Sequence, residues 1–460
     1  MPGFYQPTEE EFDPHTDAFI LHCLAKERQY QHFDLPLSDE ARNQQFDPSS
    51  EVAPHRFLPL LGYTDITRKF VRDDSGNRHE KIKMRPIRFA AHEDAAYLQA
   101  YADHLGPIYE AALVKDGTSG SVLAYRRGGG TNIHHAKSLF DEISQRQNCS
   151  VFALDISGFF DCLNHDHLKY EVSRLVGVDR LSGHDWTVFH NVTRYSWVES
   201  DDLDTLLGNK RKRHGRVCTP DQFKSHVRGR KSGLVRKHEF DFGIPQGTPV
   251  SGLYANIYLR TFDQEILRLV TSFGGSYRRY SDDIAVALPL GAKQDHVVGL
   301  IEKFIADFAL ALSTEKTETA DFNGGALVGD KPIQYLGFTF DGEQKLIRPS
   351  SMDAYRSKMK HGIHAKLVAA KQQGIPSSKV FKRELLSRYT HKGVRRNFIQ
   401  YAYKSADILD APEIRHQVRN HIKWFNKVWD REVVKVYGGL VTSAYQLKMQ
   451  RGNYGSLVLY

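Results

Sequence analysis

The chain has 460 residues, which is long enough for about three structural units and a large buried core. Apolar residues make up 40% of it and charged residues 26%, proportions that are ordinary for a globular protein and that exclude a low-complexity chain. Lysine and arginine number 63 against 55 acidic residues, so the formal net charge is +8, a surplus that favours polyanionic partners without requiring one.

The cysteines and the apolar runs exclude further classes of protein. Cys23, Cys149, Cys162 and Cys218 are scattered without a zinc-binding spacing, which predicts free thiols in a reducing compartment. The opening stretch MPGFYQPTEEEFDPH is acidic and lacks the apolar core of a signal peptide. No apolar run approaches the roughly 20 residues that cross a bilayer. We therefore expect a cytoplasmic protein with no membrane partner.

The sequence pattern changes twice along the chain. Residues 1–75 mix one short helical patch with turn-rich sequence and are expected to form an N-terminal extension. Residues 76–347 alternate short strand-like runs with helical patterns, which favours an α/β or α+β body, and they carry a densely basic insertion at about 205–240. Residues 348–460 are helical and basic before a tail without a clear pattern, so we place a domain boundary near residue 348.

Two acidic segments within the body point to metal chemistry. Asp155 ends the apolar run 151–156, a predicted buried strand, and a buried lone aspartate is costly unless it is paired, hydrogen-bonded or bound to metal. The stretch YRRYSDDIAVAL, residues 277–288, predicts two strands with Asp282 and Asp283 at the turn. If this hairpin lies beside the first strand, three carboxylates converge, and divalent cations are needed to neutralise them, as in two-metal phosphoryl transfer. Oxygen ligands alone favour Mg²⁺.

Each segment also has a purely structural interpretation, because aspartate favours turns whatever the function. A third segment, FGIPQGTPVSGLYANIYLRTF at 242–262, adds a run of breakers followed by an amphipathic helix from about Ser251. Within it, Gly247 allows the backbone to approach a ligand closely, and Gln246 offers an amide to a sugar or base.

Five segments resemble, in their order along the chain, the successive palm motifs of reverse transcriptases: FALDISGFFD, GIPQGTPVSGLYANIYL, YSDD, LSTEKTE and YLGFTF. Within that family they most resemble the bacterial group II intron, retron and phage-defence enzymes. The resemblance covers about residues 80–345, and the ordered set is specific. It implies an α+β right-hand fold, with fingers and palm over 76–347, an antiparallel palm sheet backed by helices, and an α-helical thumb in 348–460.

The resemblance also implies roles for individual palm residues. Asp155, Asp282 and Asp283 match the catalytic aspartates that bind two Mg²⁺ ions, with Mn²⁺ as a substitute, and Ile156 completes the implied metal-binding set. Phe160 matches the steric gate that rejects a ribose 2′-OH, although simple core packing is the alternative.

Further matches surround the incoming nucleotide. Gln246 and Gly247 match the loop lining the nucleotide, and Lys316 matches a catalytic lysine near the triphosphate, a general acid for pyrophosphate; a solvated surface lysine is the alternative. In the fingers, KIKMRPIRF offers Lys83 and Arg85, and LAYRRGGGTNIHHA offers Arg126, as triphosphate ligands that neutralise phosphate oxygens. Plain contacts to a nucleic-acid backbone are the alternative for these three residues. YLGFTF at 335–340 resembles the primer grip.

The sequence departs from the family pattern at two positions and in one insertion. Gly252 stands where many relatives have proline, which is expected to loosen the start of the helix, and Ser281 stands where alanine is common. The basic insertion at about 205–240 has two interpretations, a solvated loop or a clamp on template RNA or a bound noncoding RNA.

The implied function is that of an RNA-directed DNA polymerase, a nucleotidyltransferase that uses dNTPs and copies a partner noncoding RNA template into cDNA. Nothing beyond the thumb resembles an endonuclease, which disfavours a self-mobilising intron protein and favours a role in bacterial antiphage defence. A homo-oligomer or an operon-encoded effector protein is the further partner that such a setting suggests.

Three rival functions stay open on the sequence alone. A template-independent or protein-primed DNA polymerase would use a tyrosine such as Tyr460 or Tyr454 as primer. A non-catalytic RNA-binding scaffold would need no aspartates, which the presence of all three argues against. A ribonucleotide polymerase would not need Phe160 as a gate.

Overall fold

The computed structural model describes residues 30–38, 55–72, 77–208, 215–229, 233–292, 294–313, 316–393 and 397–438. It divides into two compact units, the first made of residues 1–131 and 148–321 and the second of residues 132–147 and 322–460. Most of the predicted extension 1–75, Cys23 and the tyrosines Tyr454 and Tyr460 lie outside the described residues.

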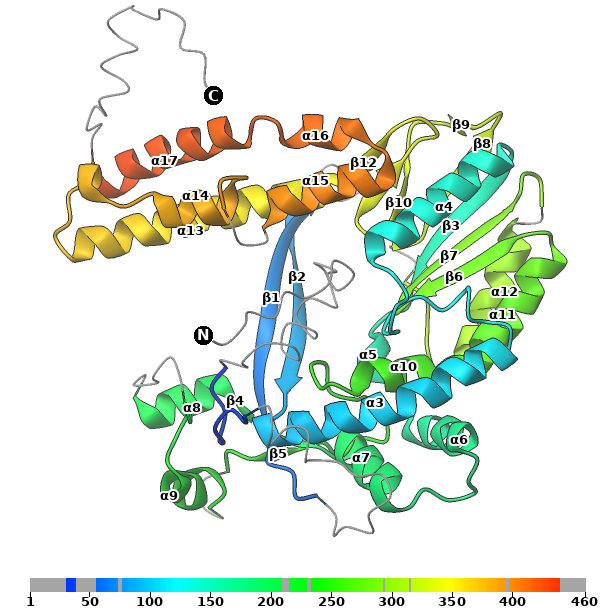
Figure 1. Ribbon diagram of the computed structural model, residues 1–460, viewed down its shortest axis with the longest axis horizontal. Helices are drawn as coiled ribbons and strands as arrows, with labels where there is room; N and C mark the ends of the chain where they lie inside the picture. Colours follow the sequence, from blue (N-terminus) through cyan, green and yellow to red (C-terminus); the bar gives the residue numbers. More distant parts are fainter. Residues whose placement is uncertain are drawn as a thin grey trace, which may run out of the picture. The chain divides into compact units, whose positions relative to one another are not determined.

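An antiparallel sheet in the first unit carries both acidic segments (Figure 1). Its order within this unit is β6 (Ser276–Tyr280), β7 (Asp283–Pro289), β3 (Cys149–Asp155) and β8 (Glu318–Asn323), the last of which runs across the unit boundary. The apolar runs of β3 and β7 are almost wholly buried, as expected for strands covered on both faces. The strand predicted around Asp155 and the hairpin predicted around the acidic pair are therefore both present.

Helices supply most of the core of the first unit. They are α3 (His92–Lys115), α5 (Phe159–Cys162), α6 (His165–Val176), α7 (Gly183–Thr193), α10 (Ser251–Tyr258), α11 (Arg260–Ser272) and α12 (Gln294–Asp307). All eight residues of α10 are buried, so this helix passes through the centre of the core. α11 is amphipathic, and it buries Phe262, Ile266 and Val270 beside β6.

A second sheet of the first unit has the order β2 (Arg78–Phe89), β1 (Leu60–Arg72), β4 (Ser196–Glu199) and β5 (Arg236–Lys237). β1 and β2 form a long antiparallel ribbon in which Thr67 lies opposite Lys83 and Asp65 opposite Arg85. Because side chains alternate along a strand, Lys83 and Arg85 share one face of this ribbon.

The described part of the basic insertion is folded rather than a solvated loop. It contains the end of α8 (Ser200–Leu207), the short helix α9 (Pro220–Gln222), a π-helix (Phe223–Val227) and β5. Val217, Cys218 and Val227 are buried and belong to a small apolar core with Leu61 and Val198. Thr219 closes a capping box at the start of α9, which fixes this helix locally.

The second unit combines a small sheet with helices. The strands β10 (Ile333–Tyr335), β11 (Phe338–Phe340) and β12 (Lys345–Ile347) form an antiparallel sheet, preceded by β9 (Ala326–Val328). The helices are α4 (Asn132–Arg146), α13 (Pro349–Gln372), α14 (Arg383–Tyr389), α15 (Phe398–Leu409), α16 (Pro412–Val418) and α17 (His421–Tyr437), with a 3₁₀ turn at Ser377–Lys379. The rings of Phe140 and Phe340 stack 5.1 Å apart, and α13 packs along α17.

The α+β class expected from the sequence is confirmed. A long helix begins at Pro349, next to the predicted boundary, but compactness also assigns α4 to the second unit. The fingers, palm and thumb boundaries therefore stay a prediction. Among the described residues, no helix combines the length and the apolar character needed to cross a membrane. The described cysteines Cys149, Cys162 and Cys218 are free thiols.

Candidate active site

Strand pairing brings Asp155 to the turn that carries Asp282 and Asp283. β3 and β7 run antiparallel with Asp155 opposite Asp283, and the backbone N–H of Ile156 donates to the carbonyl oxygen of Asp282 at 2.9 Å. The N–H of Ser313 donates to the carbonyl oxygen of Asp155 at 2.7 Å, which fixes the strand end from the other side. Two segments more than 120 residues apart in the sequence therefore meet at one point.

The turn between β6 and β7 is tight and strained. Tyr280 pairs with Asp283, so only Ser281 and Asp282 form the connection. Ser281 is buried and has a φ of 60°, in the left-handed region that a residue with a side chain seldom adopts. Arg279, which is fully buried, donates from Nη1 to the carbonyl oxygen of Ser281 at 3.1 Å and to Asn256 Oδ1 at 3.1 Å. These contacts hold the turn in its unusual conformation.

The carboxylates of this site interact electrostatically. Burial raises the pKa of Asp282, and the negative charge of Asp155 raises it further. Lys316 forms an ion pair with Oδ2 of Asp155, so the predicted catalytic lysine lies at the predicted metal ligand. Its side chain is about half exposed, at 47%, which leaves the ammonium accessible to an anionic ligand.

Strand β2 adds cations to the same place. Burial lowers the pKa of Lys83, the charges of Arg85 and Lys316 lower it further, and Asp155 and Asp282 raise it. Lys83 therefore lies within electrostatic range of both carboxylates and of Lys316. Lys83 and Lys316 beside the two carboxylates, with Arg85 next to Lys83 on β2, form a surface suited to a phosphate-bearing ligand that brings metal with it.

The donor set fits magnesium only in part before substrate binds. Among the residues described, no three histidine, cysteine or acidic side chains already lie together as a metal-binding group. The predicted set of Asp155, Ile156, Asp282 and Asp283 is thus not a closed cage. However, Mg²⁺ usually takes one or two protein carboxylates and completes its shell with water and substrate phosphates. Asp155 and Asp282, which repel each other and offer only oxygen, suit that pattern.

The loop that carries Gln246 and Gly247 lies against strand β2. Gln246 bridges to Ile87, and the N–H of Arg88 donates to the carbonyl oxygen of Gln246 at 2.8 Å. Gly247 has a φ of 118°, and a Cβ there would lie 2.9 Å from the carbonyl oxygen of Arg88, so glycine is required for this approach. Nε2 of Gln246 donates to Asp161 Oδ1 at a long 3.4 Å.

Phe160 is half-buried rather than enclosed in the core. The N–H of Ile244 donates to its carbonyl oxygen at 2.8 Å, which joins the segment after β3 to the loop containing Gln246. Its ring meets the ring of Tyr125 edge to face, with centroids 6.3 Å apart. The ring predicted as a gate is therefore partly exposed, and it packs against the core and against Tyr125.

Arg126 is engaged by the protein itself. Its Nε and Nη2 donate to the carboxylate of Glu110 at 2.6–3.1 Å, Nη1 donates to the carbonyl oxygens of Ser119 and Val122, and Nη2 donates to Ser119 Oγ. These contacts use all five guanidinium hydrogens. A triphosphate contact by Arg126 would require breaking some of these hydrogen bonds, and that contact stays a prediction.

Sequence reasoning passed over the residues that support the turn, namely Tyr125, Asn256, Asp263 and Arg279. One signal for Arg279 was present, because alternation in YRRY places Tyr277 and Arg279 on the same face, toward the core. A buried arginine requires an acidic partner, and Asp263 on α11 is that partner.

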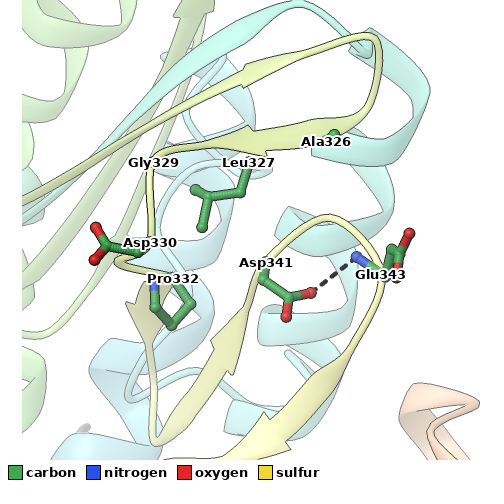
Figure 2. Close-up of a pocket in the computed structure, with 7 residues that line it drawn as sticks. All are labelled: Ala326, Leu327, Gly329, Asp330, Pro332, Asp341 and Glu343. Carbon is green, nitrogen blue, oxygen red and sulfur yellow. Dashed lines mark hydrogen bonds between the residues drawn. The ribbon is translucent and has the colours of Figure 1, made fainter.

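The second unit has a hollow of about 360 Å³ beside the hairpin that resembles the primer grip (Figure 2). It is lined by Ala326, Leu327, Gly329, Asp330, Pro332, Asp341 and Glu343. Asp341 Oδ1 accepts the N–H of Glu343 at 2.9 Å, so that carboxylate shapes the loop at the rim.

The antiparallel sheet with carboxylates at a strand end and at the neighbouring hairpin turn, beside a cationic strand, defines a polymerase-like α+β protein. The model for the family described as reverse transcriptase (RNA-dependent DNA polymerase) matches residues 78–340, more than half of the chain, and the chain belongs to this family. Members of the family generally use a divalent metal, an RNA template and dNTPs.

Solved structures and curated proteins were also compared. The chain is similar to apo telomerase from Candida tropicalis (12% identity, TM-score 0.37, covering 87% of this chain and 67% of that one). It is also similar to a form of that telomerase truncated from its C-terminal domain (12%, 0.35, 60% and 53%). A third similar structure is telomerase from Candida albicans in complex with a TWJ fragment of telomeric RNA (12%, 0.38, 91% and 66%). The chain thus spans between about half and two thirds of these proteins. No curated protein matches it.

Proposed function

We propose that the chain is an RNA-directed DNA polymerase whose active site is centred on Asp155 and the Ser281–Asp282–Asp283 turn. The observation that carries this proposal is the pairing of β3 with β7, which sets Asp155 opposite Asp283 and ties Ile156 to Asp282. Membership of the reverse transcriptase family supplies the class of reaction.

In this proposal, Asp155 and Asp282 hold two Mg²⁺ ions, with Mn²⁺ as a substitute, and Asp283 and Ile156 complete the predicted set. Bound there, the metal would make the primer 3′-OH a better nucleophile and neutralise charge on the leaving oxygens. Lys83 and Arg85, on one face of the ribbon, bind triphosphate oxygens that the metal does not reach.

The remaining residues orient the nucleotide and assist its reaction. Lys316, half exposed beside Asp155, is placed to give a proton to the departing pyrophosphate. Phe160 excludes the ribose 2′-OH by occupying the space that a hydroxyl would need. The Gln246–Gly247 loop, held against β2, brings its backbone close to the nucleotide.

Primer extension on an RNA template with dNTPs and Mg²⁺ tests this proposal. Wild-type protein should extend the primer, and Asp155→Asn and Asp282→Asn should each slow extension at least about 100-fold, because charge stabilisation of the transition state is lost. Asp307→Asn, an exposed acidic residue at the end of α12, is the matched control and should extend normally. Equal extension by all variants would contradict the proposal.

The template and the biological setting form a finer part of the proposal, namely copying of a partner noncoding RNA in bacterial antiphage defence. Its support is the resemblance of the ordered palm motifs to the retron and defence lineage. Sequencing the nucleic acid that co-purifies with the protein should show one RNA and its cDNA, with the cDNA missing in Asp155→Asn. Unaltered phage protection by Asp155→Asn would instead favour a non-catalytic scaffold.

The same preparation separates a nucleic-acid primer from a protein primer. Products made by wild-type protein are run with and without protease digestion. Unchanged migration is expected for a nucleic-acid primer, whereas DNA released only by proteolysis would indicate a tyrosyl primer.

A further inference from the structure

Ser281 in the turn and Gly252 in α10 both contact one side chain, that of Tyr125. The hydroxyl of Tyr125 lies 3.1 Å from Oγ of Ser281, within hydrogen-bond distance. The ring of the same tyrosine lies against Gly252 in α10, where an added Cβ would be 2.5 Å from Cδ1 and 2.7 Å from Cγ. The Ser281 hydroxyl can therefore hydrogen-bond to Tyr125, and the absence of a side chain at Gly252 leaves room for its ring.

The backbone around Tyr125 is held in an unfavourable conformation. Tyr125 has a φ of 56°, in the left-handed region, which costs free energy for a residue with a Cβ. On its N-terminal side, the N–H of Leu123 donates to the carbonyl oxygen of Arg279 at 2.9 Å, and Nδ2 of the buried Asn256 donates to the carbonyl oxygen of Ala124 at 2.7 Å. The surrounding structure thus overrides the local preference and aims the ring at the turn.

Tyr125 also contacts the predicted gate. Its ring meets that of Phe160 at an interplanar angle of 81°, with centroids 6.3 Å apart, a favourable edge-to-face arrangement. One side chain thus contacts both the turn that carries Asp282 and the aromatic ring five residues after Asp155. All these residues belong to the first compact unit.

We propose that Tyr125 is a positioning residue that couples Phe160 to the Ser281–Asp282 turn, so that one side chain sets both sugar discrimination and the geometry of the catalytic turn. Gly252 provides the space that this requires. The proposal rests on the proposed polymerase function and adds to it a determinant of nucleotide selectivity that does not itself touch the reacting atoms.

The hydroxyl and the ring of Tyr125 have separable effects. Tyr125→Phe and Ser281→Ala each remove the hydrogen bond, and each should lower kcat about three- to tenfold, the worth of one neutral hydrogen bond, while leaving the dNTP-to-rNTP ratio of kcat/KM unchanged. The double variant should lose no more than either single variant, because both remove the same contact. The control Tyr170→Phe, at a 60% exposed tyrosine, should behave as wild type.

Gly252→Ala tests the ring. The new Cβ displaces the Tyr125 ring and disturbs its edge-to-face contact with Phe160. The dNTP-to-rNTP ratio of kcat/KM should therefore fall at least about threefold, which corresponds to the free energy of one aromatic contact. Thermal unfolding gives a readout independent of catalysis. Gly252→Ala should lower Tm in the presence of Tyr125 but not in a Tyr125→Ala background, whereas Gly299→Ala, in open space on α12, should lower it in neither.

The outcomes separate this proposal from the polymerase assignment. If wild-type protein extends primers but the ratio is unchanged in Gly252→Ala, or the losses of Tyr125→Phe and Ser281→Ala add in full, the coupling role is overturned and the polymerase stands. If wild-type protein does not extend primers, the polymerase assignment and the coupling role both fail.

Discussion

Arg279 and Asp263 form an ion pair in which both side chains are fully excluded from solvent. Nη2 of Arg279 donates to Oδ2 of Asp263 at 2.6 Å and Nε donates to Oδ1 at 2.8 Å, and the hydroxyl of Tyr277 adds a third hydrogen bond to the same carboxylate. Burial alone would lower the pKa of Arg279, but the carboxylate of Asp263 raises it, so the guanidinium stays charged. Because Arg279 also donates a hydrogen bond to the carbonyl oxygen of Ser281, the pair stabilises the turn of the candidate active site from its buried side.

Removing one partner of this pair should be strongly destabilising. Asp263→Ala leaves a buried, unpaired guanidinium and should cost about 3–5 kcal/mol of unfolding free energy, measured by urea denaturation. Arg127→Ala, which breaks an exposed ion pair with Asp103, is the control and should cost less than about 1 kcal/mol. The double substitution Asp263→Leu with Arg279→Met should recover part of the stability lost in Asp263→Ala. If Asp263→Ala lost no more stability than the control Arg127→Ala, the Arg279–Asp263 pair would not be buried as described.

Two glycines should respond to alanine in opposite directions. Gly247→Ala places a Cβ at φ 118° and 2.9 Å from the carbonyl oxygen of Arg88, and should destabilise the protein by about 1–3 kcal/mol. Gly299→Ala, within helix α12 and facing open space, should stabilise it by about 0.5–1 kcal/mol. Thermal unfolding of Gly247→Ala and Gly299→Ala measures both effects. Equal changes in Tm in the two variants would be inconsistent with the loop geometry at Gly247.

Phe160→Ala should relax the discrimination between dNTP and rNTP by at least about tenfold in kcat/KM, because the proposed gate would then leave room for a 2′-hydroxyl. Single-nucleotide incorporation with matched dNTP and rNTP measures this ratio. Phe159→Ala, which removes a buried neighbouring ring, should instead lower stability, so the two phenylalanines are distinguishable. Unchanged selectivity in Phe160→Ala would remove it from the gate role.

His32 should make the stability of the protein depend on pH. Burial lowers the pKa of this imidazole to about 3, against an ordinary value of 6.5, so it stays neutral when folded. The unfolded chain binds the proton more readily, and stability present above pH 6.5 is therefore lost as the pH falls toward 3. At pH 5 the loss relative to neutral pH should be about 2 kcal/mol.

The variant His32→Asn isolates this effect. Its unfolding free energy should fall less steeply than that of wild-type protein between pH 6.5 and pH 5, and the two slopes should coincide above pH 7.5. Parallel curves over the whole range would mean that His32 binds its proton as readily in the folded protein as in the unfolded chain.

The sequence predicted those features that depend on local pattern. The apolar run before Asp155 and the two strands around the acidic pair follow from hydrophobic periodicity, and the ordered motifs indicated the family to which the chain belongs. The pairing of these strands was predicted only conditionally, because strand partners depend on contacts distant in sequence. In the structure that pairing is present, with Asp155 in register with Asp283.

Features set by the partners of a side chain were not predictable in the same way. The motif around Arg126 predicts a phosphate-binding side chain. Whether its guanidinium faces a ligand or Glu110 depends on how α3 packs, which the motif does not specify. Likewise, the left-handed backbone of Tyr125 opposes its intrinsic preference and follows from hydrogen bonds made by Arg279 and Asn256. The packing of Val217 and Val227 into a core with Leu61 was also hidden within a sequence that is basic overall.

The central claim is that Asp155 and the Asp282 turn bind one metal centre together. Replacing Mg²⁺ by Fe²⁺ in the presence of template, primer and dNTP, then generating hydroxyl radicals, cuts the backbone next to the metal. Peptide mapping should show cleavage near both residue 155 and residue 282, each suppressed by excess Mg²⁺ and by either Asp155→Asn or Asp282→Asn. Cleavage near only one of the two segments, or cleavage that survives these substitutions, would contradict the account.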